Sequence, residues 1–421
     1  MASAASATRL SRSLPQVYAA AAVRLLLPLL VLPLVASRMG PQEFGRLSFI
    51  LVWSSLLAMV VEGGFLAAAT RLAVTADAPR RWQIAQQVFS ARCALSLPVL
   101  LLSVAVVWAI GDAAPARPAG DALAIAALAV ALGWPATWYL QATQQLARWA
   151  RVELLVYATL IVLCAAFVHS VADYVVVQLA ASLLLSLLGW RWLLRDLATV
   201  RGGASLWSRE ALPAGLRLGW TMLPVGIAGA AYSFALPAAA SVQMTKVELG
   251  TYFMADRIVR AVLNAADPMF SVVYPRIVEL FSRSARAALR YAARWALAGA
   301  LAGFVLLLAG MLVWPLLEPL LLPRAGAIDL VRLHAVLQVL AWLLPLLLGW
   351  KFIGYWMLGS GRYDRAYRAC VVVGGIVGVT AAASFGGAAG ATGLAWTALG
   401  VECIVIAVAL GGIALTQRRR A

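Results

Sequence analysis

Residues 42–71 read QEFGRLSFILVWSSLLAMVVEGGFLAAATR, an apolar run that follows a Glu-Phe-Gly phrase and ends at an arginine. Its apolar part, 47–70, exceeds the roughly 20 residues that an α-helix needs to cross a bilayer. Similar runs recur along the sequence, and many contain Pro or Gly, which membrane helices tolerate. The alternating strands of about 10 residues that characterise porins are absent from the sequence. This pattern predicts an all-α polytopic membrane protein.

The composition supports the same fold class. Of the 421 residues, 63% are hydrophobic and 12% are charged, about half the roughly 25% charged residues of a soluble domain. We expect about twelve transmembrane helices. Their approximate bounds are 16–37, 47–70, 90–111, 121–145, 152–170, 173–190, 218–240, 251–275, 295–317, 334–359, 369–386 and 391–415.

The first apolar run also has features of a secretory signal. Arg9 and Arg12 precede residues 14–37, and a small-residue Val-Ala-Ser sequence closes the run. We expect an uncleaved first helix instead, because the run is long enough to span the membrane and is needed for the repeat described below.

The basic residues define an orientation. If the N-terminus is cytoplasmic, the predicted inside segments hold twenty-four basic residues, Arg92 among them, and the outside segments hold six. This bias predicts that both termini lie in the cytoplasm. The net charge of +17 is explained by this topology, and since no basic patch is interleaved with aromatic residues, we expect no nucleic-acid partner.

The two halves of the sequence match each other. At an offset of 205 residues, Glu43 aligns with Glu248 and Gly45 with Gly250. Glu62 aligns with Asp267 and Arg71 with Arg276 at the same offset. We therefore expect two six-helix lobes related by an internal repeat: residues 1–195, a cytoplasmic linker 196–217, and residues 218–421. An even number of spans gives both copies the same orientation, as in parallel-repeat transporters.

Cations inside the predicted spans are candidate substrate contacts, because a charge in the membrane is costly. The candidates are Arg24, Arg257, Arg260 and Lys351. Together they predict a cationic central cavity for an anionic ligand, since the arginine fork grips phosphate oxygens and keeps its proton. In the alternative interpretation, Arg24 and Arg257 reach the lipid headgroups and Arg260 only pairs with Asp256, four residues earlier on its helix.

Three carboxylates are candidates for ion coupling: Glu62, Asp267 and Asp256. Burial raises the pKa of a carboxyl group, so titration during transport is one role. For Glu62 and Asp267 the alternative is a neutral, hydrogen-bonded partner of a helix kink, next to Gly63-Gly64 and Pro268. Glu43 and Glu248 open their helices, and N-terminal capping explains them without a ligand role.

Aromatic and amide side chains cluster in two of the predicted spans, 121–145 and 334–359. They either line a sugar path or lie at the membrane interfaces, where Trp and Tyr are common. The sequence has no P-loop, and its two histidines, His169 and His334, are far apart. We expect no ATP hydrolysis, no metal site, no cofactor and no enzyme activity.

Two short motifs carry a family resemblance. Residues 39–48, MGPQEFGRLS, resemble the L-G-P-x-E-[FY]-G-x-[YL] signature of polysaccharide-exporter membrane proteins. Residues 138–141, WYLQ, are similar to the W-x-[FL]-Q-G phrase of the same family, with Ala142 in place of the glycine. These are the O-antigen (Wzx-type) flippases of the multidrug/oligosaccharidyl-lipid/polysaccharide exporter superfamily.

The resemblance implies a flippase that moves undecaprenyl-diphosphate-linked oligosaccharide to the outer leaflet by alternating access. It implies residence in the bacterial inner membrane, with membrane lipids and other polysaccharide assembly proteins as partners. Two alternatives remain open: a cation-coupled multidrug exporter of the same superfamily, and a membrane-embedded glycan enzyme or scaffold. The arginines of span 251–275 favour an anionic substrate over an organic cation.

Overall fold

The computed structural model describes residues 31–110, 118–230, 234–266, 269, 273, 276–277, 279–281, 284–321, 329–360, 363–386 and 389–418. These residues are largely helical, and none of them forms a strand. The all-α prediction is therefore confirmed.

Eight helical stretches of the described chain are long and apolar enough to cross a membrane. They are Pro41–Ala73, Ala78–Ile110, Pro118–Ala142, Arg148–Phe167, Val171–Asp196, Ala285–Leu316, Leu330–Gly354 and Gly390–Thr416. Each overlaps one of the predicted spans, and Val372–Gly386 is a shorter apolar helix. The protein is thus a multi-pass membrane protein, while the count of twelve spans stays a prediction.

The chain folds into two compact units. Unit 1 contains Phe49–Phe234, and unit 2 contains the described residues up to Ser48 and those from Ala235 onward. Helix α2 (Pro41–Glu62) therefore begins in unit 2 and ends in unit 1.

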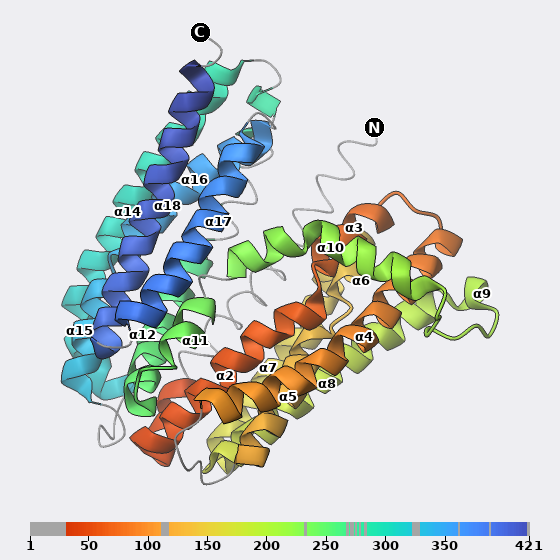
Figure 1. The fold of residues 1–421 in the computed structure, drawn as a ribbon, viewed down its shortest axis with the longest axis horizontal. Helices are drawn as coiled ribbons and strands as arrows, with labels where there is room; N and C mark the ends of the chain where they lie inside the picture. Colours follow the sequence, from red (N-terminus) through yellow and green to blue (C-terminus); the bar gives the residue numbers. More distant parts are fainter. Residues whose placement is uncertain are drawn as a thin grey trace. The chain divides into compact units, whose positions relative to one another are not determined.

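Unit 1 continues from α2 through eight further helices, all present in Figure 1. They are α3 (Phe65–Ala73), α4 (Ala78–Ile110), α5 (Pro118–Gly133), α6 (Thr137–Ala142), α7 (Leu146–Phe167), α8 (Val171–Asp196), α9 (Ala198–Arg201) and α10 (Ala211–Ala230). Helix α4 packs against α5 and α10, and α8 packs against α5 and α7. Gly215 lets α10 approach α4 closely: a Cβ at this position would fall 2.2 Å from the carbonyl oxygen of Gln87.

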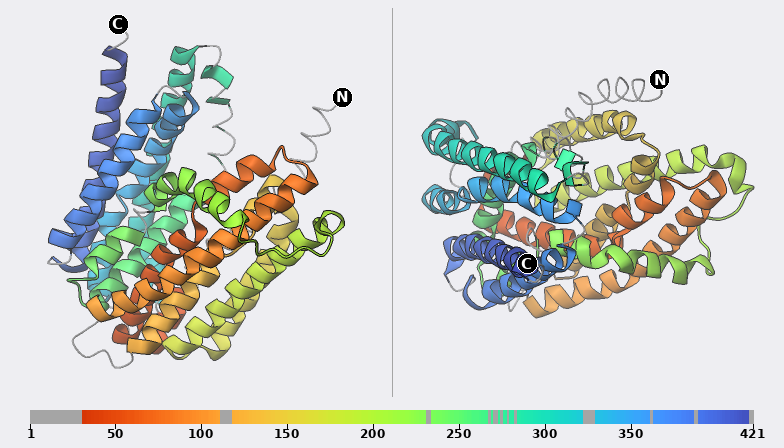
Figure 2. Two further views of the ribbon diagram at one scale, coloured as in Figure 1. Left: turned by 45° about the vertical axis from the view of Figure 1, so that its right-hand side comes forward. Right: turned by 90° about the horizontal axis from the view of Figure 1, so that it is seen from above.

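Unit 2 holds helices α11 (Leu236–Ala240), α12 (Lys246–Ala265), α14 (Ala285–Leu321), α15 (Leu330–Leu340), α16 (Leu343–Ser360), α17 (Asp364–Ala381) and α18 (Gly390–Arg418), with one π-helical turn, η3 (Ala382–Gly386). Helices α14 and α16 lie side by side (Figures 1 and 2). Gly299 and Gly303 of α14 meet the backbone of α16 without a side chain between them. Small residues let membrane helices approach in this way, because packing rather than hydrophobicity drives their association.

The aligned glycines of the internal repeat touch each other inside unit 2. A Cβ at Gly250 would lie 3.1 Å from the Cα of Gly45, and a Cβ at Gly45 would lie 2.1 Å from the carbonyl oxygen of Lys246. The preceding phenylalanine and leucine, Phe44 and Leu249, are each 1% exposed. The first turns of α2 and α12 therefore cross at equivalent positions of the two repeat copies.

The fourth predicted span of each half is interrupted. Residues 134–136 separate α5 from α6, and residues 341–342 separate α15 from α16. Pro135 explains the first interruption, because proline removes a backbone donor and clashes with the preceding turn. The shared interruption is a further parallel between the two halves.

Candidate functional site

One face of α12 collects a tyrosine, a carboxylate and an arginine. Tyr252, Asp256 and Arg260 are four residues apart, and residues at this spacing are neighbours on a helix. Tyr252 is 1% exposed and Asp256 is 3% exposed. The Nε of Arg260 donates to both carboxylate oxygens of Asp256, at 2.8 and 2.9 Å. The predicted Asp256–Arg260 pairing is therefore confirmed.

Further charges lie on α12 and on helices that pack against it. The guanidinium of Arg257 lies over the ring of Phe253, 4.7 Å from its centroid, a favourable cation–π geometry. Glu402 lies on α18, which packs against α12. Lys351 is half-buried on α16, which packs against α12. Of the predicted substrate contacts, Arg24 lies outside the described residues.

Glu62 ends α2 and caps the helix that follows. Its carboxylate accepts hydrogen bonds from the backbone N–H groups of Gly64 and Leu66, at 2.9 and 2.5 Å. Both Gly63 and Gly64 have positive φ angles, 62° and 75°, which glycine adopts without strain. Glu62 thus makes the hydrogen bonds expected of a kink partner. Its repeat counterpart, Asp267, lies outside the described residues.

Arg92 is a charged group whose position the sequence did not reveal. The charge bias of the sequence assigns it to the cytoplasmic basic residues, but it lies within α4, is 1% exposed, and is among the largest fully buried side chains. Its Nη1 donates to the carbonyl oxygens of Trp134 and Pro135, at 2.8 and 3.0 Å. One feature of the sequence pointed to its burial: Arg92 lies two residues inside the predicted span 90–111, and an apolar sequence follows it.

The sequence also did not predict the burial of two carboxylates. Glu153 of α7 is 6% exposed and accepts a hydrogen bond from the indole nitrogen of Trp149 at 2.9 Å. Asp121 lies in the first turn of α5 and is 5% exposed. Both are close to the ends of predicted spans, where the sequence alone does not separate exposed charges from buried ones.

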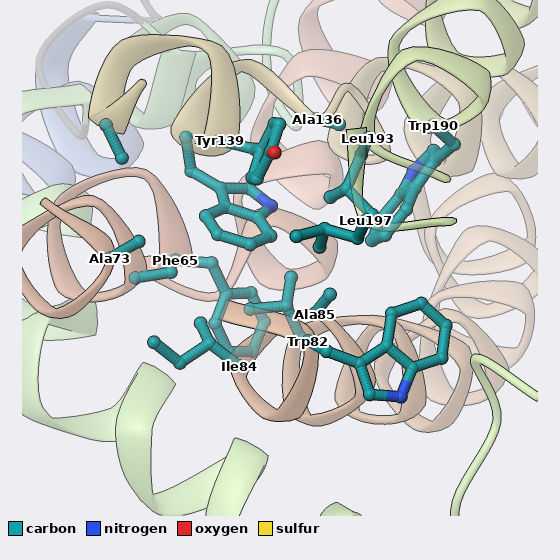
Figure 3. Packing of buried hydrophobic residues seen from close by; sticks show 14 of the residues in the cluster. Phe65, Ala73, Trp82, Ile84, Ala85, Ala136, Tyr139, Trp190, Leu193 and Leu197 are labelled. Carbon is teal, nitrogen blue, oxygen red and sulfur yellow. The ribbon is translucent and has the colours of Figure 1, made fainter. Parts of the chain in front are cut away.

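The aromatic residues of span 121–145 belong to the core of unit 1. Trp138 and Tyr139 are 0% and 2% exposed. They pack with Phe65 and Trp190 in a cluster formed by α3, α4, α6 and α8 (Figure 3). The burial of Trp138 and Tyr139 is that of core residues, which argues against a sugar path lined by these two side chains.

The start of α12 carries the predicted helix cap. Glu248 forms a capping box with Thr245 at the start of α12, so the predicted capping role is confirmed. Within the part of the chain that the structure describes, no group of three or more His, Cys, Asp or Glu side chains is placed to hold a metal ion.

Comparisons with known proteins agree with this architecture. The polysaccharide biosynthesis protein family matches residues 18–281 of the chain. No curated protein sequence matches it. Among solved structures, a multidrug resistance MATE family transporter of the MOP superfamily in an inward-facing conformation is 16% identical, with a TM-score of 0.69 and coverage of 94% of each chain.

A second solved structure has a similar fold. The lipid II flippase MurJ, in an inward closed conformation, is 10% identical and has a TM-score of 0.67. The match covers 93% of this chain and 85% of MurJ. Identities this low establish the fold alone, whereas the family match extends over more than half of the chain and agrees with the resemblance of residues 39–48 and 138–141. The chain therefore belongs to the polysaccharide biosynthesis protein family and has the fold of MOP-superfamily transporters.

Proposed function

We propose that this protein is a flippase that moves undecaprenyl-diphosphate-linked oligosaccharide from the cytoplasmic to the outer leaflet of the bacterial inner membrane. It works by alternating access through a cationic central cavity, with both termini in the cytoplasm. The family match and the MurJ-like fold support a lipid-linked substrate. Other polysaccharide assembly proteins are its expected partners.

The observation that carries the proposal is the cationic character of α12. This helix carries two half-buried arginines, Arg257 and Arg260, beside one buried carboxylate, Asp256. Asp256 is bound through the Nε of Arg260, and phosphate oxygens suit the planar guanidinium fork. We assign the diphosphate to Arg257 and Arg260, with Arg24 and Lys351 completing the binding site.

The carboxylates have a separate proposed role. Asp256, Glu62 and Asp267 are the candidates for coupling transport to a cation. Asp256 holds Arg260 in the described structure, so this pair sets how much of the arginine charge a substrate encounters. This link between a carboxylate and a substrate-binding cation supports coupling at α12 more directly than at Glu62, whose carboxylate caps α3.

A variant pair on α12 tests the phosphate-binding role. We expect Arg260→Gln to lower the flipping rate of a fluorescent polyprenyl-diphosphate sugar in proteoliposomes by roughly 10- to 100-fold. That range corresponds to the loss of one charge-assisted hydrogen-bond set, about 1.5–3 kcal/mol. Arg290→Gln is the matched control, because Arg290 is exposed and belongs to α14. Equal rates for Arg260→Gln and the control, at equal membrane insertion, would show that Arg260 does not bind the diphosphate.

The second candidate function is a cation-coupled multidrug exporter, favoured by the likeness to a MATE transporter. Such a transporter would gain from the loss of a cavity cation, so Arg260→Gln would leave organic-cation efflux intact or raise it. Mass spectrometry of polyprenyl-linked intermediates from the host separates the two functions. Accumulation of one complete diphosphate-linked oligosaccharide on gene deletion supports the flippase, a truncated glycan indicates an enzyme, and an unchanged lipid pool favours drug export.

A further inference from the structure

Two interrupted helices meet in unit 1. The first interruption is Gly63-Gly64, between α2 and α3, and the second is residues 134–136, between α5 and α6. Helices α2 and α5 are in contact next to the two interruptions, since a Cβ at Gly133 would fall 2.5 Å from the Cβ of Val61. Helices α3 and α6, which follow the interruptions, also pack against each other.

Each interruption is stabilised by a side chain whose charge is opposite to that of the nearby helix end. The start of α3 has the positive end of a helix dipole, and the Glu62 carboxylate accepts two of its N–H groups. The end of α5 has the negative end, and the Arg92 guanidinium donates to the carbonyls of Trp134 and Pro135.

The surroundings of Arg92 resemble the coordination shell of a cation. Two backbone carbonyl oxygens from an interrupted helix face the guanidinium, and the Phe65 ring centroid is 5.7 Å from its central carbon. In other transporters, unwound carbonyls and the C-terminal ends of half-helices coordinate exchangeable cations. Here an arginine that is 1% exposed occupies the equivalent environment.

A structural role alone does not require this charge. A neutral amide would satisfy the same carbonyls without the cost of moving a guanidinium out of water. The indole nitrogen of Trp190 already donates to the Trp134 carbonyl at 3.0 Å. The Nε of Arg92 is buried and has no hydrogen-bond partner among the described residues. The positive charge, rather than the number of donors, is therefore what the side chain contributes.

We propose that Arg92 is a tethered cation: it permanently fills a cation-binding site formed by the carbonyls of Trp134 and Pro135 beside the ring of Phe65. It acts as a positioning residue that holds α6 against α3 and α4. Two consequences follow. The site takes no exchangeable cation while Arg92 is present, and its removal leaves a vacancy that binds a guanidinium ion.

The test is chemical rescue of the full-length purified protein. Arg92→Ala should lower the Tm by roughly 5 °C or more. Guanidinium chloride at low millimolar concentration should restore part of that loss along a saturating curve, whereas tetramethylammonium chloride, which has no N–H donors and is larger, should not. The wild type and Arg80→Ala, an exposed arginine of the same helix, should show no stabilisation by guanidinium.

A second comparison remains available if Arg92→Ala fails to fold. Arg92→Lys keeps the charge and Arg92→Gln keeps neutral donors, so the lysine variant should retain the higher Tm. Greater stability of the glutamine variant, or no guanidinium-specific shift in a folded alanine variant, would overturn the proposal.

The same variants separate this inference from the proposed function. The Tm measurements do not depend on the proposed function, and only the transport assay rests on it. Guanidinium should restore sugar-lipid flipping by Arg92→Ala together with its Tm. If the wild type does not flip the sugar lipid but the alanine variant still gains stability from guanidinium, the proposed function is wrong and the tethered cation stands. If the wild type flips the sugar lipid and guanidinium has no effect on the alanine variant, the tethered cation is wrong and the proposed function stands.

Discussion

The crossing of Gly45 and Gly250 makes a quantitative prediction about the repeat. In Gly45→Ala the new Cβ would lie 2.1 Å from the carbonyl oxygen of Lys246 and 2.3 Å from its carbonyl carbon. Both atoms are backbone, so no side chain is able to rotate away. The starts of α2 and α12 would have to separate by about 1 Å to reach ordinary contact distance.

The cost of that separation is that of overpacking, about 1–3 kcal/mol. Gly250→Ala should cost less, because its nearest contacts are 3.1–3.3 Å. Gly400→Ala is the matched control: it lies in α18, and no atom is within 4 Å of its Cβ position. Helix propensity alone should make the control more stable than the wild type by about 0.5–1 kcal/mol.

The assay is thermal unfolding of the three purified variants in one detergent, followed by intrinsic tryptophan fluorescence. We expect the Tm to decrease in the order Gly400→Ala, Gly250→Ala, Gly45→Ala, and we expect the Tm of Gly45→Ala to lie below that of the wild type. A Gly45→Ala protein as stable as the Gly400→Ala control would refute the close backbone crossing of the two repeat copies.

Two further predictions concern local backbone geometry. Gln144 has a φ of 56° in the turn after α6, so Gln144→Gly should raise the free energy of unfolding by about 1 kcal/mol by relieving left-handed strain; an unchanged denaturation midpoint would contradict this. Thr245 caps α12 through a reciprocal pair of hydrogen bonds with Glu248. Thr245→Ala should cost about 0.5–2 kcal/mol, and Thr245→Ser, which keeps the hydroxyl, should cost much less in the same unfolding measurement.

Local sequence features were sufficient for several elements. The apolar runs predicted all eight described helical stretches that are long and apolar enough to cross a membrane, because lipid requires a continuous apolar surface whatever the neighbours are. The capping role of Glu248 and the Asp256–Arg260 pair also followed from spacing within one helix. The cap and the ion pair depend on residues no more than four positions apart, and each span depends on one continuous stretch of the sequence.

The position of Arg92 depended on tertiary structure. Its carbonyl partners, Trp134 and Pro135, are 42 and 43 residues away along the chain, and its ring contact is with Phe65 of α3. Its sequence neighbourhood is equally compatible with a cytoplasmic helix end, where positive residues are common. Burial of a charge is decided by what packs around it, and that information lies in other helices.

The repeat shows the same division. The sequence by itself aligned Gly45 with Gly250 and predicted a duplicated chain, because that alignment needs only the order of residues. Only the tertiary structure decided that the two glycines touch, and that Glu62 and Arg92 hold matching interruptions in unit 1. The physical reason is that membrane character and helix ends arise from local chemistry, whereas contacts, burial and charge pairing arise from the packing of distant segments.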